Sequence, residues 1–179
     1  MMKPDLVLSL VAARLEPTPS AIAALLDGVS PQAIRERSPS GAWSILEIVN
    51  HLADEDADDF RFRLKSMLDD PTRPWPLSNP EAWATEREYQ QRDLAESLDR
   101  FAKERAESIR WLRSLRGPDW KTAYMHPSRG PVYAGELLAA WPAHDALHIR
   151  QIAKRLYELA AREGAAAGFN VEYAGPWGA

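Results

Sequence analysis

Apolar residues at helical spacing, with almost no strand pattern, most limit what this chain can fold into. Long stretches rich in Ala, Leu, Glu, Arg and Gln carry apolar residues mostly at steps of three, four or seven, whereas period-two alternation is scarce. This spacing gathers apolar side chains on one face of a helix, and that face must be buried against other helices. The 179 residues suffice for one domain with a hydrophobic core and are few for two. The sequence therefore predicts a single all-α domain.

Four helical segments are delimited by caps, prolines and glycines. The first is interrupted at residues 16–19, and the second begins at Ser44, which has capping-box spacing to Glu47. Irregular connections are predicted over residues 69–80 and 119–135, where prolines and glycines gather. The helical segments span about residues 4–27, 44–68, 79–115 and 136–162. We therefore expect a four-helix bundle with long crossover connections over residues 1–163, followed by a tail over residues 164–179.

The composition excludes several classes of partner and site. The formal net charge is −4, which gives no electrostatic reason to expect nucleic-acid binding. The chain has no cysteine, so any metal must be held by His, Asp, Glu or water. The apolar stretch over residues 6–15 is too short to span a bilayer and lacks a signal-peptide cleavage pattern. We expect a cytoplasmic protein that binds neither nucleic acid nor a membrane.

Three of the four histidines lie on predicted helices at positions that suit a metal site. His144 and His148 are four residues apart, which places them about 40° apart around the helix and roughly 6 Å apart along it. Both fall at the edge of the apolar arc of their helix, and His51 falls at the margin of the arc of the second helix. Together they offer three neutral nitrogen ligands for one divalent ion. The alternative is that each is a partly buried histidine satisfied by one hydrogen bond.

Other ligand sets fit the sequence less well. A di-iron carboxylate bundle needs Glu-x-x-His on two helices, and neither Glu47 with His51 nor the fourth helix has that spacing. His126 lies in a predicted loop and is not expected to be a ligand. A mononuclear site on His51, His144 and His148 is therefore predicted.

Several polar side chains lie near the predicted ligands. Glu55, one turn beyond His51, and Asp54 are candidate catalytic residues that could orient a ligand or move a proton. Asp145 projects into the apolar arc and needs a partner, either an arginine or the backbone. Gln151, one turn beyond His148, can hydrogen-bond near the site. The alternative for the acidic stripe of the second helix is a solvated face, and the stripe comprises Glu47, Asp54, Glu55 and Asp58.

Two stretches of sequence resemble the signatures of the DinB-like, or YfiT-like, metalloenzyme family. Residues 41–52 read Gly-Ala-Trp-Ser-Ile-Leu-Glu-Ile-Val-Asn-His-Leu and are followed by Asp54 and Glu55, as in the second helix of that family. Residues 144–152 read His-Asp-Ala-Leu-His-Ile-Arg-Gln-Ile and are similar to its fourth helix, and residues 126–130 are similar to the loop before it. The resemblance covers residues 17–159. Pro142 departs from it, and we expect a kink or bulge there that shifts the aim of His144.

The resemblance implies a four-helix bundle that holds a metal, most often nickel or zinc, on His51, His144 and His148, and commonly forms a homodimer. Family members include transferases and isomerases that use low-molecular-weight thiols such as bacillithiol, mycothiol or glutathione. Three functions stay open for a small-molecule substrate: thiol-linked transfer or isomerisation, hydrolysis by activated water, and a non-catalytic metal-binding stress-response bundle. The acidic stripe argues mildly against a thiol that carries several carboxylates.

Overall fold

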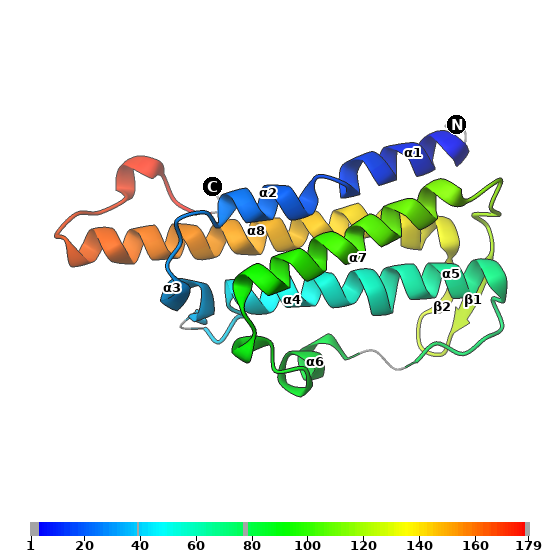
Figure 1. Ribbon diagram of the computed structural model, residues 1–179, viewed down its shortest axis with the longest axis horizontal. Helices are drawn as coiled ribbons and strands as arrows, with labels where there is room; N and C mark the ends of the chain where they lie inside the picture. The colour runs from blue at the N-terminus through cyan, green and yellow to red at the C-terminus, as the bar shows by residue number, and fades with distance from the viewer. Residues whose placement is uncertain (1–3, 39, 77–78, 178–179) are drawn as a thin grey trace.

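The computed structural model describes residues 4–38, 40–76 and 79–177, and most of them are helical (Figure 1). Helices α4 and α5 are joined without a break through a π-helical turn, η1 (Glu55–Phe60). The main helices are α1 (Pro4–Leu15), α2 (Thr18–Leu25), α4 (Ile45–Asp54), α5 (Arg61–Asp69), α7 (Leu94–Ser114) and α8 (Ala134–Ala166). The short elements are α3 (Pro31–Arg35), α6 (Pro80–Glu86), η2 (Tyr89–Gln91), β1 (Ala123–His126), β2 (Gly130–Tyr133) and η3 (Glu172–Ala174).

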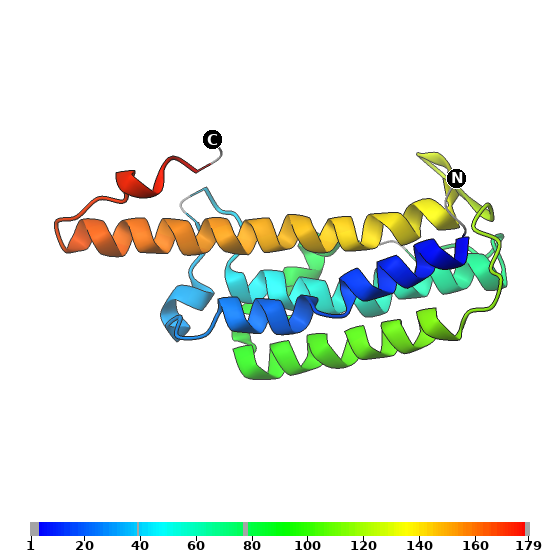
Figure 2. The same ribbon diagram turned by 90° about the horizontal axis from the view of Figure 1, so that it is seen from above.

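Four helical rods pack side by side and confirm the predicted all-α four-helix bundle (Figures 1 and 2). The rods are α1 with α2, α4 through α5, α7, and α8, and the last turns of α8 run past the other three. The interruption predicted at residues 16–19 separates α1 from α2. Residues 1–3 and 178–179, the outer ends of the predicted bundle and tail, lie outside the described residues.

The apolar core is divided into two clusters. One gathers Ile22, Ile34, Leu52 and Ile152 with their neighbours, and the other gathers residues of α1, α5 and the first turns of α8, including Leu15, Leu64 and Trp141. Along the chain, buried Asp56, Arg105, Asp145 and His148 lie between residues of one cluster and residues of the other, and buried His51 lies among residues of the first cluster. The bundle therefore buries these polar residues within its core, and we call them the polar layer. Each buried polar group in this layer needs a hydrogen-bond or ion-pair partner.

Helix α4 begins where the capping box predicts. The Ser44 side chain accepts a hydrogen bond from the Glu47 backbone N–H (3.2 Å), and the Ser44 N–H donates to the Glu47 carboxylate (2.9 Å). The same carboxylate is paired with Arg37 from the preceding loop. This reciprocal cap satisfies two of the free N–H groups at the helix start, so it sets where His51 falls on α4.

The π-helical turn η1 was not predicted, because the sequence shows a single helical pattern across residues 44–68. A π turn adds a residue to the helical ladder, which changes the direction of the side chains that follow it. The adjacent residues Glu55 and Asp56 of this turn are both buried but face different partners. Asp56 accepts a hydrogen bond from Arg105, whereas Glu55 lies beside His51. Such turns occur often at functional sites.

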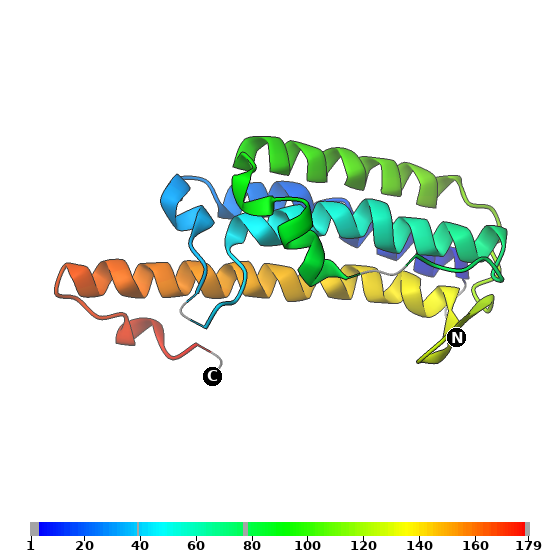
Figure 3. The same ribbon diagram turned by 90° about the horizontal axis from the view of Figure 1, so that it is seen from below.

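Two parts of the chain differ from the predictions. Residues 119–135 were expected to be irregular, but they hold an antiparallel hairpin whose register pairs Ala123 with Tyr133 and His126 with Gly130. The third predicted segment is split into α6 and α7, because Glu88 takes a left-handed conformation (φ +52°) and Asp93 caps a new helix at the Ala95 and Glu96 N–H groups. The crossover and α6 pass across α4 (Figure 3).

Pro142 does not interrupt α8, contrary to the expected kink or bulge. The helix is continuous over Ala134–Ala166 and runs straight in Figures 1 and 2. A proline removes only its own N–H bond to the preceding turn. The neighbouring Trp141 is buried and stacks on Phe60 with ring centroids 5.3 Å apart, so packing holds the helix across the missing bond.

The end of the chain folds back after α8. Tyr157 donates a hydrogen bond to the Gly175 carbonyl (3.1 Å), and its ring lies 5.5 Å from that of Trp177. Phe169 and Tyr173, the other two aromatic residues of the predicted tail, are exposed. Of these three aromatic residues, Trp177 is the one that packs against α8.

One stretch near the N-terminus, Leu6–Leu25, is long and apolar enough by composition alone to cross a membrane. Here it is divided between α1 and α2, and both helices pack on the bundle through α7 and α8. A helix of a bundle core passes the same test of length and composition.

Arg105 of α7 joins four parts of the bundle at the polar layer. Its guanidinium donates to Asp56 of η1 (2.7 Å), to both carboxylate oxygens of Asp145 on α8 (2.5 and 3.0 Å) and to the Leu15 carbonyl at the end of α1 (2.8 Å). All three charged side chains are buried. The predicted need of Asp145 for an arginine partner is thereby met.

We predict that Arg105→Ala lowers the free energy of unfolding by about 3–5 kcal/mol, because it leaves two buried carboxylates without their cation. Urea denaturation followed by circular dichroism measures the loss. Arg113→Ala is the matched control, since its ion pair with Glu16 is more than half exposed (56% and 53%) and such pairs contribute about 1 kcal/mol or less. Equal losses in the two variants would contradict a structural role for the Arg105 network.

Candidate metal centre

Three histidine side chains from two helices converge on one point. The Nε2 atom of His144 lies 3.4 Å from that of His51 on α4 and 3.1 Å from that of His148 on α8. The three ligand atoms all lie within 4.8 Å of one another. Zinc–nitrogen bonds of 2.0–2.1 Å in a tetrahedral site separate two ligand nitrogens by about 3.3 Å. The spacing of these nitrogens therefore fits a divalent ion bound by all three side chains, as the sequence predicted.

The histidines are held in the neutral form that metal ligands require. Burial, with the neighbouring His148 and His144, lowers the pKa of His51 to about 2. Burial and His148 lower the pKa of His144 to about 3, and burial lowers the pKa of His148 as well. Their Nε2 lone pairs are therefore free of protons near neutral pH.

A neighbouring side chain orients the His148 ring. The Nδ1–H of His148 donates to the Gln151 side-chain oxygen (2.8 Å), which leaves the lone pair on Nε2. This contact confirms the predicted hydrogen bond of Gln151 near the site. The Nδ1 atom of His51 lies 3.8 Å from the Glu55 carboxyl, which is too far for a hydrogen bond, and it has no hydrogen-bond partner among the described residues.

Aromatic rings enclose the histidines from the protein side. Trp43 lies 4.8 Å from the His51 ring, and Phe60 lies 5.2 Å from the His144 ring, between centroids. Trp43 belongs to the loop before α4 and Phe60 to the end of η1. These contacts restrict the rotation of the imidazoles, so the ligand geometry is preorganised.

On their other side the histidines form part of the wall of a cavity of about 1580 Å³. Other lining residues come from the loop before α4 (37, 38 and 40–43), from the crossover and α6 (75, 76, 79–81 and 85) and from the hairpin. Figure 3 shows α6 beside α4 and the hairpin beside the start of α8. An ion held by the three nitrogens is therefore reachable by a molecule in this cavity. His126 also lines it but does not join the three-histidine group, and its Nδ1 accepts from the Ser128 N–H (3.2 Å).

The two predicted catalytic carboxyls are placed differently. Glu55 lines the cavity, where burial and the nearby Asp59 carboxylate raise its pKa to about 8. Asp54 is buried outside the cavity lining and is held by Tyr89, Arg100 and Arg87. This placement argues against the catalytic role predicted for Asp54 and assigns it to packing of α4 against α7 and η2. Adjacent residues of a helix point in different directions, so only one of the two could face the histidines.

Three of the four residues of the acidic stripe are buried, and only Asp58 among them is solvated, as the alternative interpretation expects for a surface position. Glu47 is neutralised by Arg37, Asp54 by Arg87 and Arg100, and the exposed Asp58 by Arg87. Its charges therefore do not add up to a negative field over the histidines. The sequence-based argument against an anionic ligand loses its basis here.

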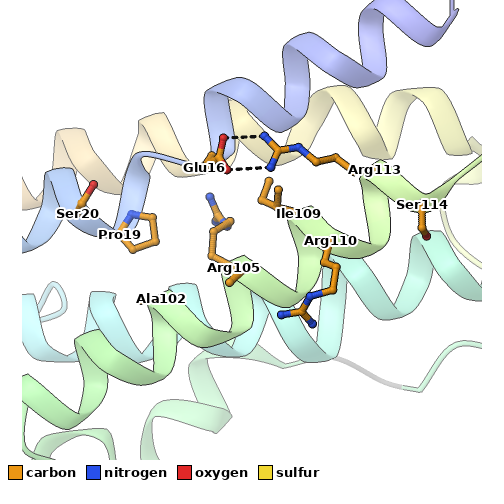
Figure 4. Close-up of a pocket in the computed structure, with 10 residues that line it drawn as sticks. Glu16, Pro19, Ser20, Ala102, Arg105, Ile109, Arg110, Arg113 and Ser114 are labelled. Atoms are coloured by element: carbon orange, nitrogen blue, oxygen red, sulfur yellow. Dashed lines mark hydrogen bonds and ion pairs between the residues drawn. The ribbon is translucent and has the colours of Figure 1, made fainter.

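A second concavity lies between the α1–α2 junction and α7 (Figure 4). Arg105 forms part of its wall, and the ion pair between Glu16 and Arg113 crosses its rim. None of the three clustered histidines lines it, so it is separate from the candidate metal centre.

The fold and the site define a four-helix bundle with a cluster of three histidines, suited to hold a metal ion, at an open cavity. The model of the DinB superfamily matches residues 14–152, and the chain belongs to that superfamily. YfiT from Bacillus subtilis, described as a probable metal-dependent hydrolase with an unusual four-helix bundle topology, is similar in structure: TM-score 0.79, 19% identity, 89% of this chain and 91% of that one. TT2238, a four-helix bundle protein, has a TM-score of 0.56, 20% identity and coverage of 82% and 98%. No curated protein matches the chain significantly.

We predict that the purified protein binds about one divalent ion per chain and that His148→Ala abolishes the binding, because two histidines do not complete the ligand set. Elemental analysis after dialysis against nickel or zinc measures the content. His126→Ala is the matched control, since this histidine lines the same cavity outside the ligand group. Loss of metal from His126→Ala but not from His148→Ala would contradict the assigned site.

We also predict that zinc affinity of the folded protein falls less than about tenfold between pH 7 and 5.5. With pKa values of about 2 for His51 and about 3 for His144, protons compete little for the ligands. Three exposed histidines would lose roughly several hundredfold. Competition titrations measure the affinity. Because the histidine pKa values are lowered by folding, their contribution to stability is present above about pH 6.5 and is lost as the pH falls. Circular dichroism must therefore show folded protein at pH 5.5, and a steep loss of affinity in folded protein would refute the prediction.

Proposed function

We propose that this chain is a metal-dependent enzyme in which a divalent ion, nickel or zinc, on His51, His144 and His148 activates a small thiol for transfer or isomerisation. The observation that carries the proposal is the convergence of three neutral Nε2 atoms on the wall of a large cavity. Structural zinc sites are closed by four protein ligands, whereas catalytic sites use three and keep a position for water or substrate. An open cavity at the ligands thus favours an enzyme over a non-catalytic metal-binding bundle.

A divalent ion bound there supplies Lewis acidity, which lowers the pKa of a thiol or of water. The chain contributes the rest of the site. Gln151 holds the orientation of His148, and Trp43 shields His51 from one side. With a pKa of about 8, Glu55 carries a proton near neutral pH and can give it to a substrate group in the cavity. The chain has no cysteine, so the sulfur belongs to a substrate or cosubstrate.

Hydrolysis by activated water is the second candidate function. The description of Bacillus subtilis YfiT as a probable metal-dependent hydrolase supports it, together with the Glu55 carboxyl beside the ligands. The homodimer and the cytoplasmic location also stay proposals. Exposed leucines on α1 and α8, among them Leu10 and Leu147, are compatible with self-association.

The two candidate reactions are separated by one pair of assays on the metal-loaded protein. With bacillithiol, mycothiol or glutathione and monochlorobimane, we expect faster adduct formation than without protein. His148→Ala should remove the acceleration, and Glu55→Gln, which keeps shape but not acid–base function, should reduce it about a hundredfold. His126→Ala is the control that should keep it. Hydrolysis of 4-nitrophenyl acetate without thiol, and no adduct with any thiol, would instead favour the hydrolase.

A further inference from the structure

One end of the histidine cavity carries an excess of positive charge. Arg150, Lys154 and Arg155 all line it, from the turns of α8 that follow His148. Arg155 lies seven residues, or two turns, beyond His148, and Gln151 lies between them. Positions separated by seven residues share a face of the helix and are about 10 Å apart along it. Arg155 therefore lies on the same face of α8 as His148, and Arg150 and Lys154 line the same cavity from neighbouring turns.

The carboxylates at this end do not balance these cations. Glu158 is paired with Arg155, and its other oxygen lies 3.9 Å from the Lys154 ammonium. Arg150 has no ion pair among the described residues. Arg37, the remaining cation here, is already neutralised by Glu47. One carboxylate thus faces three cations, whereas the rest of the cavity wall holds Arg63 and Arg129 together with three acidic residues, Glu55, Asp59 and Glu81, and Asp59 pairs with Arg63 (2.8 Å).

Arg155 is the best-fixed member of this group. Its side chain is buried, and one of its Nη groups donates to the Glu36 carbonyl (3.0 Å) at the start of the loop before α4. Its Nε–H has no acceptor among the described residues. Both Nη groups of Arg155 are thus engaged, one by Glu158 and one by the Glu36 carbonyl. Its charge is therefore fixed in place beside the cavity, and little side-chain entropy remains to be lost when an anion binds near it.

We propose that the cavity takes a small molecule that carries a carboxylate, with the carboxylate bound at the end formed by Arg150, Lys154 and Arg155. The inference rests on the proposed function, because it places the reacting atom of the same molecule at the histidines. The separation along α8 sets the length of the ligand: a spacer of several bonds joins the metal-binding atom to the carboxylate. A ligand of this shape bridges both ends of one continuous cavity.

The test uses cobalt-substituted protein and two matched thiols, 6-mercaptohexanoate and 6-mercaptohexanol, which differ at the end remote from sulfur. Thiolate binding is read from ligand-to-metal charge-transfer absorption, independently of any activity. Charge-assisted hydrogen bonds to the carboxylate should make the acid bind at least about tenfold more tightly than the alcohol. The double variant Arg150→Gln/Lys154→Gln should reduce this preference to about threefold or less and leave alcohol binding unchanged.

The control is Arg129→Gln, which removes a charge of the same sign from the hairpin side of the cavity and should keep the preference. Equal binding of the two thiols to wild type, or a preference that survives the double variant, overturns the carboxylate site and leaves the proposed function standing. If cobalt binds but neither thiol changes its spectrum, the thiol function fails and the carboxylate proposal fails with it.

Discussion

Burial of charge in the middle of the bundle is the constraint on which the rest of the structure depends. Arg105 lies between Asp56 and Asp145, and all three are out of contact with water. A buried charge without its partner costs several kcal/mol, so the helices can pack only in the register that brings these groups together. That register joins α7 to η1 and α8. Asp145 follows His144 directly in the sequence, and Asp56 follows Glu55. The contacts of Arg105 with these two aspartates therefore also fix the positions of His144 and Glu55 on their helices.

Burial also sets the protonation state of the groups at the histidine site. Removal from water keeps the imidazoles neutral, which is the form that binds metal, and it raises the pKa of Glu55 into the range useful for proton transfer. The rings contact Trp43, Phe60 and Gln151 as well as one another. The bundle therefore sets the histidines in place, and an open cavity lies beside them.

The cavity beside the histidines is shaped mainly by connections between the helices. The walls of the cavity come from the loop before α4, the crossover between α5 and α7, and the hairpin, while the floor comes from α4 and α8. Changes in these connections alter charge and shape without disturbing the ligands. Membership of the DinB superfamily defines the bundle, and the arrangement of Arg150, Lys154 and Arg155 is a property of this chain's cavity.

The sequence by itself determined the four helical segments, the cap at Ser44, the absence of thiolate ligands and the three histidines. These follow from local rules, namely apolar periodicity, capping chemistry and the four-residue spacing of His144 and His148. Only the tertiary structure decided that His51 meets them at 3.4 Å, that Glu55 rather than Asp54 faces the cavity, and that residues 119–135 pair as a hairpin. It also decided that the acidic stripe is neutralised by arginines from other segments. The reason is physical: a π turn, an ion pair and a shared cavity depend on side chains far apart in sequence, whose directions are set by helix packing and not by their own neighbours.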